Sequence, residues 1–302
     1  MNETLSGEAL DGKSLHGKTL FITGATRGIG LAIALRAARD GANVVIAGRS
    51  IEHNPRLPGT IFTAAAEIEE AGGVGLPLRV DLRDEQQVRA AMAEAAKRFG
   101  GIDIVVNNAA AMTLADTRHV DMARFDMMHH VNVRGAFMVS KFALPFLERA
   151  ANPHILMIAP PLDLRETFFA AHTAFSLSKF GMSMMALGLA AELRAKGVAV
   201  NALWPRTFIS TPGIPHVPQG QDNLRISRKP EIMADAAHVI LTQEAQAYTG
   251  KFLIDETVLT EHGETDFEKY AIDDNEPVAS GFLHGPSRAA PARLAKPVVA
   301  AV

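Results

Sequence analysis

The chain of 302 residues carries a formal net charge of -3 and is 48% hydrophobic, which suits one large α/β domain with a sizeable core. Its near-neutral charge argues against a nucleic-acid or anionic-membrane partner, and the absence of cysteine excludes disulfides and thiolate chemistry. No apolar run approaches the length that spans a bilayer, and the first 16 residues are too polar for a secretory signal. We therefore expect a soluble, cytoplasmic protein with no membrane or nucleic-acid partner.

Short apolar runs alternate with Ala-, Leu- and Met-rich stretches of helical spacing. The runs are predicted to be strands, at residues 19–22, 44–47, 76–80, 102–106, 154–158, 198–203 and 252–254. Glycines mark the ends of the intervening helices near Gly41, Gly72, Gly100 and Gly197. This alternation predicts an α/β fold, a single doubly wound domain with a seven-stranded parallel sheet and helices on both faces.

A glycine-rich turn directly follows the first predicted strand. It reads Thr23-Gly24-Ala25-Thr26-Arg27-Gly28-Ile29-Gly30 and leads into a predicted helix from about residue 29 to 40. A loop without bulky side chains lets a diphosphate approach the backbone, and the helix directs its free N–H groups at the anion. Because the turn stands between a strand and a helix, we predict a dinucleotide site. Its cofactor-binding residues would be Gly24, Thr26, Arg27, Gly28, Ile29 and Gly30.

Three segments depart from the strand–helix rhythm. Residues 50–60 contain two prolines and form a longer connection after the second strand. Residues 205–230 carry five prolines, which predicts a lid loop at the sheet edge where open α/β sheets place their ligands. The tail from about Asp273 has no period and is expected to be disordered or to lie on a partner. We divide the chain into an N-terminal extension (1–16), a Rossmann-type domain (17–262) and a partly disordered C-terminal extension (263–302).

Further motifs follow the glycine turn in order. They are Asn107-Asn108-Ala109-Ala110 after the fourth strand, Asn132, Lys179, and Asn201-Ala202-Leu203-Trp204-Pro205 on the sixth strand. With them, the chain resembles the short-chain dehydrogenase/reductase family over roughly residues 17–262. The chain also resembles the hydroxysteroid-dehydrogenase-like branch of this family. The stretches that carry this resemblance are Pro160-Pro161-Leu162, Phe180-Gly181-Met182-Ser183-Met184, Asn201-Ala202-Leu203-Trp204-Pro205-Arg206, Arg228-Lys229-Pro230-Glu231 and Phe252-Leu253-Ile254-Asp255-Glu256.

The resemblance implies a function and a set of site residues. It implies hydride transfer between a nicotinamide cofactor and a carbonyl, an alcohol or an activated double bond. It also implies dimers or tetramers that form through the helices bearing Asn132 and Lys179. The cofactor-binding residues carried over from the family are Leu82, Asn108, Ala109, Lys179, Pro205, Thr207 and Ile209.

The choice of cofactor can be argued from charge. Family members that use NAD usually end the second strand with an acid that binds the ribose diol, but here that strand ends in Arg49. Arg49 can fork onto a 2′-phosphate, and Arg27 can close from the other side, so we predict NADP(H). The alternative is a pair of solvated surface arginines. Asp81 resembles the residue that holds the adenine amino group, although it could equally cap the next helix.

The reacting centre that the resemblance implies lacks both of its hydroxyl groups. In the family a tyrosine donates the proton, a serine polarises the carbonyl, a lysine lowers the tyrosine pKa and an asparagine holds a water. Asn132 and Lys179 are present, but Phe175 and Ala159 occupy the tyrosine and serine positions. A positioned general acid contributes roughly 10²–10⁴ in rate, and an oxyanion donor contributes on the order of 10²-fold. We therefore expect weak or atypical catalysis.

Replacement proton donors are scarce. The chain has only two tyrosines, both far along the sequence from this helix. His172 lies three residues before Phe175, and its ordinary pKa near 6.5 suits proton transfer, although it could simply face solvent at the helix entry. Ser176 and Ser178 should turn away from the Phe175 direction. No histidine spacing suggests a metal.

Apolar residues after the fifth strand predict the wall of a substrate pocket, formed by Pro160, Pro161, Leu162, Leu164, Phe168 and Phe169. Such a wall suits a small, lipophilic substrate. The leading hypothesis is an NADP(H)-dependent oxidoreductase with an impaired reacting centre. The alternatives are a non-catalytic NADP(H)-binding protein and an enzyme in which Phe175 and Ala159 were engineered.

Overall fold

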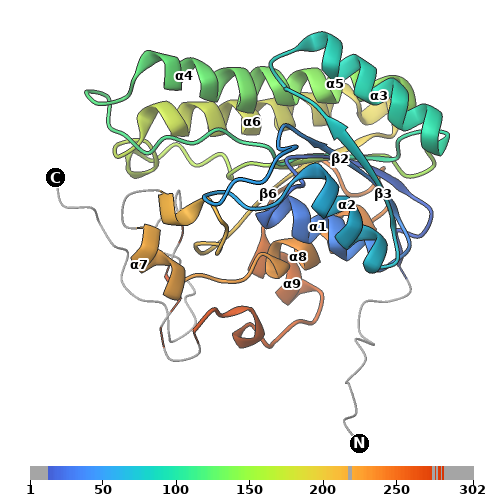
Figure 1. Ribbon diagram of the computed structural model, residues 1–302. Helices are drawn as coiled ribbons and strands as arrows, with labels where there is room; N and C mark the ends of the chain where they lie inside the picture. The colour runs from blue at the N-terminus through green and yellow to red at the C-terminus, as the bar shows by residue number, and fades with distance from the viewer. Residues whose placement is uncertain (1–12, 217–219, 274–275, 277, 280, 282–302) are drawn as a thin grey trace, which may run out of the picture.

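A parallel β-sheet forms the centre of the molecule (Figure 1). The computed structural model describes residues 13–216, 220–273, 276, 278, 279 and 281. Seven strands lie in the order β3-β2-β1-β4-β5-β6-β7, and every neighbouring pair is parallel, which confirms the predicted fold class. The strands are β1 Thr19–Thr23, β2 Asn43–Gly48, β3 Val74–Arg79, β4 Ile104–Asn107, β5 His154–Ile158, β6 Ala199–Trp204 and β7 Phe252–Ile254.

Helices cover both faces of the sheet (Figure 1). One layer contains α1 Gly28–Ala38, α2 Ile61–Glu70, α8 Glu231–Leu241 and α9 Asp255–Glu261. The other layer contains α3 Glu85–Phe99, α4 Met122–Met128, α5 Ala136–Leu147 and α6 Thr173–Glu192. Alternation along β1 places Leu20 and Ile22 in the first core and Phe21 in the second. The near-continuous apolar strands of the sequence are therefore explained by a sheet that is buried on both sides.

The strand order reverses direction between β1 and β4. The chain runs outward from β1 to β3, and β4 then pairs with the opposite edge of β1. The loops that leave β1 and β4 consequently diverge and leave a crevice at the carboxyl edge of the sheet. This topology fixes where a ligand can bind.

Several predicted element ends differ from the structure by one or two residues, and two of these shifts have a local cause. The first helix was expected to continue to about residue 40, but α1 ends at Ala38 because the backbone tightens into a turn. Gly41 has a φ of 83°, and its N–H donates to the Ala38 carbonyl at 2.8 Å. The fourth strand starts at Ile104 rather than at residue 102, because the Asp103 carboxylate accepts the Thr19 backbone N–H at 2.9 Å.

The length and composition of the helix α6 contradict the expectation that no apolar run could span a bilayer. By length and composition its 20 residues could cross a bilayer, so the statement that no apolar run approaches that length is wrong. However, 61% of its apolar window is buried inside the fold, where Met182, Ala186 and Leu189 pack in the core of the domain. This packing accounts for the apolar composition of α6.

Both extensions contact the domain where they are described. Leu15 is buried, and its backbone N–H donates to the Asp40 carboxylate at 2.8 Å. In the C-terminal extension Tyr270 is 4% exposed, and its hydroxyl donates to the Asp235 carboxylate at 2.7 Å. The Tyr270 carbonyl accepts the backbone N–H of Lys229 at 2.7 Å, which joins the extension to the end of the predicted lid. Residues 1–12 lie outside the described residues, and so do residues 282–302, which make up much of the tail that was expected to be disordered.

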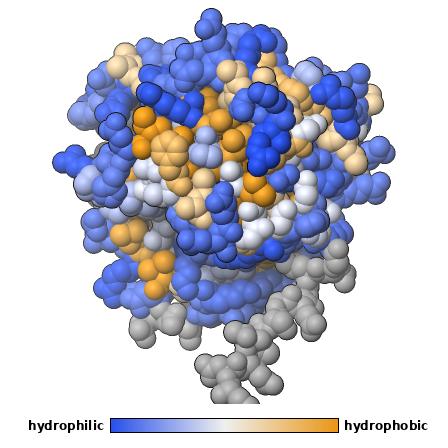
Figure 2. All heavy atoms as spheres, turned by 45° about the vertical axis from the view of Figure 1, so that its right-hand side comes forward, coloured by the Kyte–Doolittle hydropathy of each residue, from blue (hydrophilic) through white to orange (hydrophobic). Residues whose placement is uncertain are grey.

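The surface is largely hydrophilic, with apolar side chains gathered in the middle of one face (Figure 2). Large apolar side chains are also exposed on α6. Leu177, Met184 and Leu187 are 47%, 60% and 51% exposed. Their spacing of seven and three residues puts them on one side of the helix.

Candidate functional site

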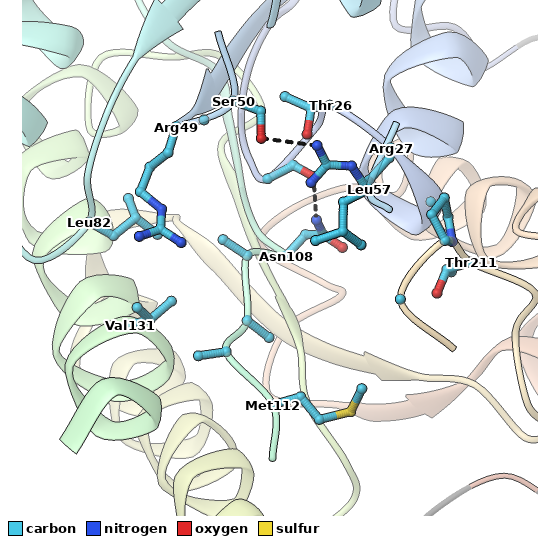
Figure 3. A pocket seen from close by; sticks show the side chains of 18 of the residues that line it. Thr26, Arg27, Arg49, Ser50, Leu57, Leu82, Asn108, Met112, Val131 and Thr211 are labelled. Carbon is cyan, nitrogen blue, oxygen red and sulfur yellow. Dashed lines mark hydrogen bonds between the residues drawn. The ribbon is translucent and has the colours of Figure 1, made fainter. Parts of the chain in front are cut away.

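A cleft of about 1220 Å³ opens at the carboxyl ends of β1 to β4. Its walls come from the β1–α1 turn, the loop that follows β2, residues 80–82 after β3 and residues 108–115 after β4 (Figure 3). The helix α4 and the following π-helix η1 (His129–Gly135) form another wall. The cleft is therefore built at the point where the strand order reverses, as the fold rule for ligand sites requires.

Glycines shape the turn between β1 and α1. Gly24 and Gly28 have φ values of 69° and 57°, a region that L side chains rarely adopt. A Cβ on Gly30 would lie 2.4 Å from Asn108 Nδ2 and 2.6 Å from the Gly24 carbonyl oxygen, so α1 packs this closely only with glycine. No side chain caps the first turn of α1, which leaves its N–H groups available to an anion. The turn fits the diphosphate of a dinucleotide.

Asn108 holds this turn from the β4 side. Its Nδ2 donates to the carbonyl oxygens of Thr23 and Gly24 at 2.9 and 3.1 Å. The Thr23 hydroxyl oxygen accepts the backbone N–H groups of Asn108 and Ala109 at 3.1 and 3.0 Å. Both Asn108 and Ala109 line the cleft as predicted, and their hydrogen bonds fix the two diverging loops to each other.

Arg27 lines the cleft, but its guanidinium is hydrogen-bonded to the loop after β2. Its Nε donates to the Pro58 carbonyl at 2.7 Å. Its Nη2 donates to the Ser50 hydroxyl at 2.9 Å and to the Gly59 carbonyl at 2.7 Å. Arg27 therefore fastens residues 50–59 onto the glycine turn, a role that the sequence interpretation did not include.

Arg49 stands at the end of β2 with its side chain 61% exposed and its Nη1 4.0 Å from Asp81 Oδ2. The nearer partner of Asp81 is Arg83, whose Nε donates at 2.9 Å and whose hydrogen bonds lower the pKa of Asp81 to about 2. The Arg49 guanidinium thus faces the cleft with only a distant counter-charge (Figure 3). Asp81 and Leu82 both line the cleft, and the cap of α3 is Asp84 instead of Asp81.

Asn132 is fully buried in the π-helix η1. Its Oδ1 accepts the Ala111 N–H at 2.7 Å, and its Nδ2 donates to the Ala111 carbonyl at 2.9 Å. The same Nδ2 donates to the Ser178 hydroxyl at 2.9 Å. These bonds occupy both amide hydrogens and the amide oxygen. The Asn132 side chain therefore fixes residue 111, and with it the wall after β4.

Phe175 lies in the first turns of α6, inside a small apolar cluster. Its side chain is 4% exposed and packs with Ala174 and Met128 and against Ala111 and Leu114. Phe175 itself does not line the cleft, but Ala111, Leu114 and Met128 do. One side of the cleft wall is thus supported by the phenyl ring.

The neighbouring polar groups on α6 point elsewhere. The Ser176 hydroxyl donates to the Phe168 carbonyl at 2.7 Å, and the Ser178 hydroxyl donates to the Phe175 carbonyl at 2.8 Å. His172 directly precedes α6 and its side chain makes no capping hydrogen bond to the helix, and burial lowers its pKa. None of these three side chains lines the cleft.

Lys179 is buried one helical turn after Phe175. Its Nζ donates to the Ile158 carbonyl at 2.7 Å and lies 5.4 Å from the centroid of the Trp204 ring. Burial lowers the pKa of Lys179 to about 7. Because Ala159 directly follows Ile158, the fold brings the lysine to the strand end where the family serine would stand. Ala159 is fully buried and presents only a methyl group.

The lid residues that line the cleft are not the ones that were predicted to bind the cofactor. Pro205, Thr207 and Ile209 were expected to bind the cofactor but do not line the cleft, which is lined instead by Thr211, Pro212 and Gly213. A Cβ on Gly28 would lie 3.1 Å from the Thr211 methyl group, so the lid touches the glycine turn. The available signal for these missed residues is the Thr-Pro-Gly run inside the predicted lid.

Other contributors to the cleft were also missed. The loop after β2 provides Ser50, Asn54, Arg56 and Leu57, and the lid provides His216. The His216 Nε2 is 2.8 Å from the Arg56 carbonyl oxygen, so lid and loop meet across the cleft. The apolar wall expected from residues 160–169 does not line it. Among the residues with described positions, no group of three or more His, Asp or Glu side chains could hold a metal.

The family model described as short chain dehydrogenase matches residues 18–219. The chain belongs to the short chain dehydrogenase family. Hydroxysteroid dehydrogenase-like protein 2 of Danio rerio is 50% identical over 267 residues, which are 88% of this chain and 64% of that protein. The chain thus spans less than two thirds of this relative's length.

Solved structures agree with this assignment. A putative dehydrogenase from Xanthomonas campestris is 54% identical, with a TM-score of 0.86 over 90% of this chain and 100% of that chain. A short chain dehydrogenase from Mycobacterium thermoresistibile is 45% identical, with a TM-score of 0.86 over 93% and 99%. The predicted family and Rossmann-type fold are confirmed. The family consists of oxidoreductases that use a nicotinamide cofactor and act on small molecules.

Proposed function

We propose that this chain binds NADP(H) and that its hydride transfer to a carbonyl or from an alcohol of an apolar substrate is weak or atypical. The observation that carries the proposal is Phe175, which places a ring without a hydroxyl group four residues before the buried Lys179. A bound nicotinamide would supply or accept the hydride. The proton must then come from a group other than a tyrosine at position 175.

The preference for NADP(H) is supported by the charge at the end of β2. Arg49 replaces the acid that would bind a ribose diol, and its exposed guanidinium lines the cleft. A guanidinium binds a phosphate through paired hydrogen bonds. The diphosphate would be held by the glycine turn, and Leu82 and Ala109 would contact the adenosine part. Arg27 would contribute by holding the loop, because its own donors are engaged.

The expected loss of rate follows from the two side chains. The lack of a positioned acid lowers the rate of the chemical step by a factor of roughly 10²–10⁴. The lack of an oxyanion donor lowers it by a further factor on the order of 10². The two factors need not multiply, since such groups act as a unit. Ordinary ketone reduction should therefore be slow.

A second candidate is a non-catalytic NADP(H)-binding protein. It is favoured by one observation: the Phe175 ring is packed in an apolar cluster, and neither it nor Ala159 nor Lys179 lines the cleft. Such a protein would bind the cofactor with ordinary affinity and show no turnover.

One experiment separates the two candidates. Ala159→Ser combined with Phe175→Tyr restores both hydroxyls, and NADPH oxidation is then followed against a panel of lipophilic ketones and aldehydes. We expect the double variant to turn over at least about 10²-fold faster than the original. Phe62→Tyr is the matched control, because it adds a phenol at an exposed position on α2.

The outcomes have different meanings. A faster double variant beside a slow but active parent supports the impaired enzyme, whereas a fully inactive parent that binds NADPH supports the second candidate. Equal rates in parent and double variant would mean that the chemistry uses other groups, and the proposal would then be wrong.

A further inference from the structure

The cleft extends beyond the part that suits a dinucleotide. Past the glycine turn its lining continues along residues 112–115 and along α4. The apolar side chains of this end are Met112, Leu114, Met127 and Met128. Arg124 lies one helical turn before Met127 and Met128 on α4 and lines the same cleft.

This end of the cleft lies next to Phe175, the position at which the family resemblance implies the reacting centre. Leu114 and Met128 line the cleft and also pack in the cluster that holds the Phe175 ring. An apolar group seated here would therefore lie on the wall that the ring supports. That is the position expected of a substrate, since the other end of the cleft carries the glycine turn and Arg49.

The guanidinium of Arg124 is not paired with any acid among the described residues. Its side chain is exposed, and within the described part of the chain its guanidinium forms no ion pair or side-chain hydrogen bond. Among the residues whose positions are described, Asp81 is the one acid that lines the cleft, and its carboxylate is hydrogen-bonded by Arg83. Arg56 and His216 also line the cleft, and neither is an acid that could pair with Arg124. The cleft thus offers an available cation beside apolar side chains.

We propose that this end of the cleft binds a molecule with an apolar body and a single oxyanion group, with Arg124 determining the specificity for the oxyanion. The apolar body would lie against Met112, Leu114 and Met127. A guanidinium presents paired N–H donors that match a carboxylate or a phosphate, and burial of the apolar body against the methionines adds the hydrophobic contribution. The identification of this bound molecule as the substrate rests on the proposed function.

Binding measurements test the inference without relying on turnover. Decanoate, decyl phosphate and decan-1-ol are titrated by calorimetry into the protein, with and without NADPH. We expect at least one of the two anions to bind about tenfold or more tightly than the alcohol, and Arg124→Ala to remove that difference. Arg124→Lys should retain part of it. Arg118→Ala is the matched control, because Arg118 is exposed nearby but does not line the cleft.

The two anions distinguish a carboxylate-bearing from a phosphate-bearing molecule. Equal binding of alcohol and anions, or an anion preference unchanged in Arg124→Ala, would overturn the inference. An Arg124→Ala variant that loses NADPH affinity by the same factor would also overturn it, because Arg124 would then belong to the cofactor site. Failure of the parent to bind NADPH would contradict the proposed function alone, since the titrations without cofactor test Arg124 by themselves.

Discussion

At the scale of single residues, Lys179 is a buried amine with an unusual set of neighbours. Its Nζ lies 2.7 Å from the Ile158 carbonyl oxygen and 3.4 Å from the Met182 sulfur, and no carboxylate is among the causes of its shifted pKa. The residue one helical turn before it, Phe175, carries no hydroxyl group. The burial of Lys179 is a net cost to stability when the amine is charged.

The cost should depend on pH. Burial lowers the pKa of Lys179 from 10.5 to about 7, so the folded state binds fewer protons than the unfolded state between those values. Stability then rises with pH across this window, and the penalty is complete below about pH 7. Lys179→Met removes the titrating group. We expect its stability relative to the parent to be higher at pH 6 than at pH 10, by a few kcal/mol.

Urea denaturation at the two pH values measures this difference. Lys251→Met is the matched control, because Lys251 is exposed and should show no such dependence. A difference between Lys179→Met and the parent that is the same at both pH values would contradict the lowered pKa.

Arg49 carries the cofactor preference at the same scale. We expect Arg49→Ala to weaken NADPH binding by about 1.5–3 kcal/mol and to leave NADH binding nearly unchanged, because only NADPH carries the 2′-phosphate. Fluorescence titration with both cofactors measures the two affinities. A parent protein that prefers NADH would show that the charge argument is wrong.

At the scale of elements, the contact between α1 and the β4 loop is limited by Gly30. Gly30→Ala would place a Cβ against Asn108 Nδ2 and the Gly24 carbonyl, and the carbonyl is backbone that cannot turn away. We expect a loss of about 1–3 kcal/mol of stability from overpacking, together with weaker NADPH binding because the turn is displaced. Chemical denaturation and cofactor titration give the two values.

Gly101→Ala is the control for this substitution. A Cβ on Gly101 meets nothing within 4 Å, and Gly101 has no positive φ. If Gly30→Ala were as stable as Gly101→Ala and bound NADPH normally, the close approach of α1 would not be required.

The lid is an element fixed at both ends. Arg206 at its start and Arg228 near its end both pair with the Glu256 carboxylate, at 3.3 and 2.9 Å. Its middle touches the loop after β2 through His216. The lid residues that line the cleft, Thr211, Pro212, Gly213 and His216, lie between these two fixed ends.

At the scale of the whole molecule, the exposed side of α6 suggests self-association, and we propose a homodimer or homotetramer. Leu177, Met184 and Leu187 leave an apolar stripe on a helix whose other side is core. We expect Met184→Glu to shift the protein to monomers in sedimentation velocity. Phe62→Glu, at a position 56% exposed on α2, should leave the assembly unchanged. A monomeric parent would contradict the proposal.

Much of the fold could be predicted from local sequence. The seven strands follow from apolar runs, and their shared parallel direction follows from the helices between them. The glycine turn was predictable because its chemistry is carried by consecutive residues: Gly24 and Gly28 adopt the positive φ values that the turn needs. Arg49 directly follows β2 and Asp81 lies two residues after β3, so the topology that fixes the strand ends places both at the cleft.

The sequence alone predicts the topology, the glycine turn and the side chains without hydroxyl groups at positions 159 and 175, since each depends on residue identity or on neighbours along the chain. The hydrogen-bond partners of Arg27 depend on the tertiary structure, because the path of the loop after β2 brings the carbonyls of Pro58 and Gly59 to its guanidinium. The tertiary structure also decided that Phe175 packs in an apolar cluster beside the cleft instead of lining it. Such contacts join segments far apart in the chain, and no local pattern of residues encodes their distances.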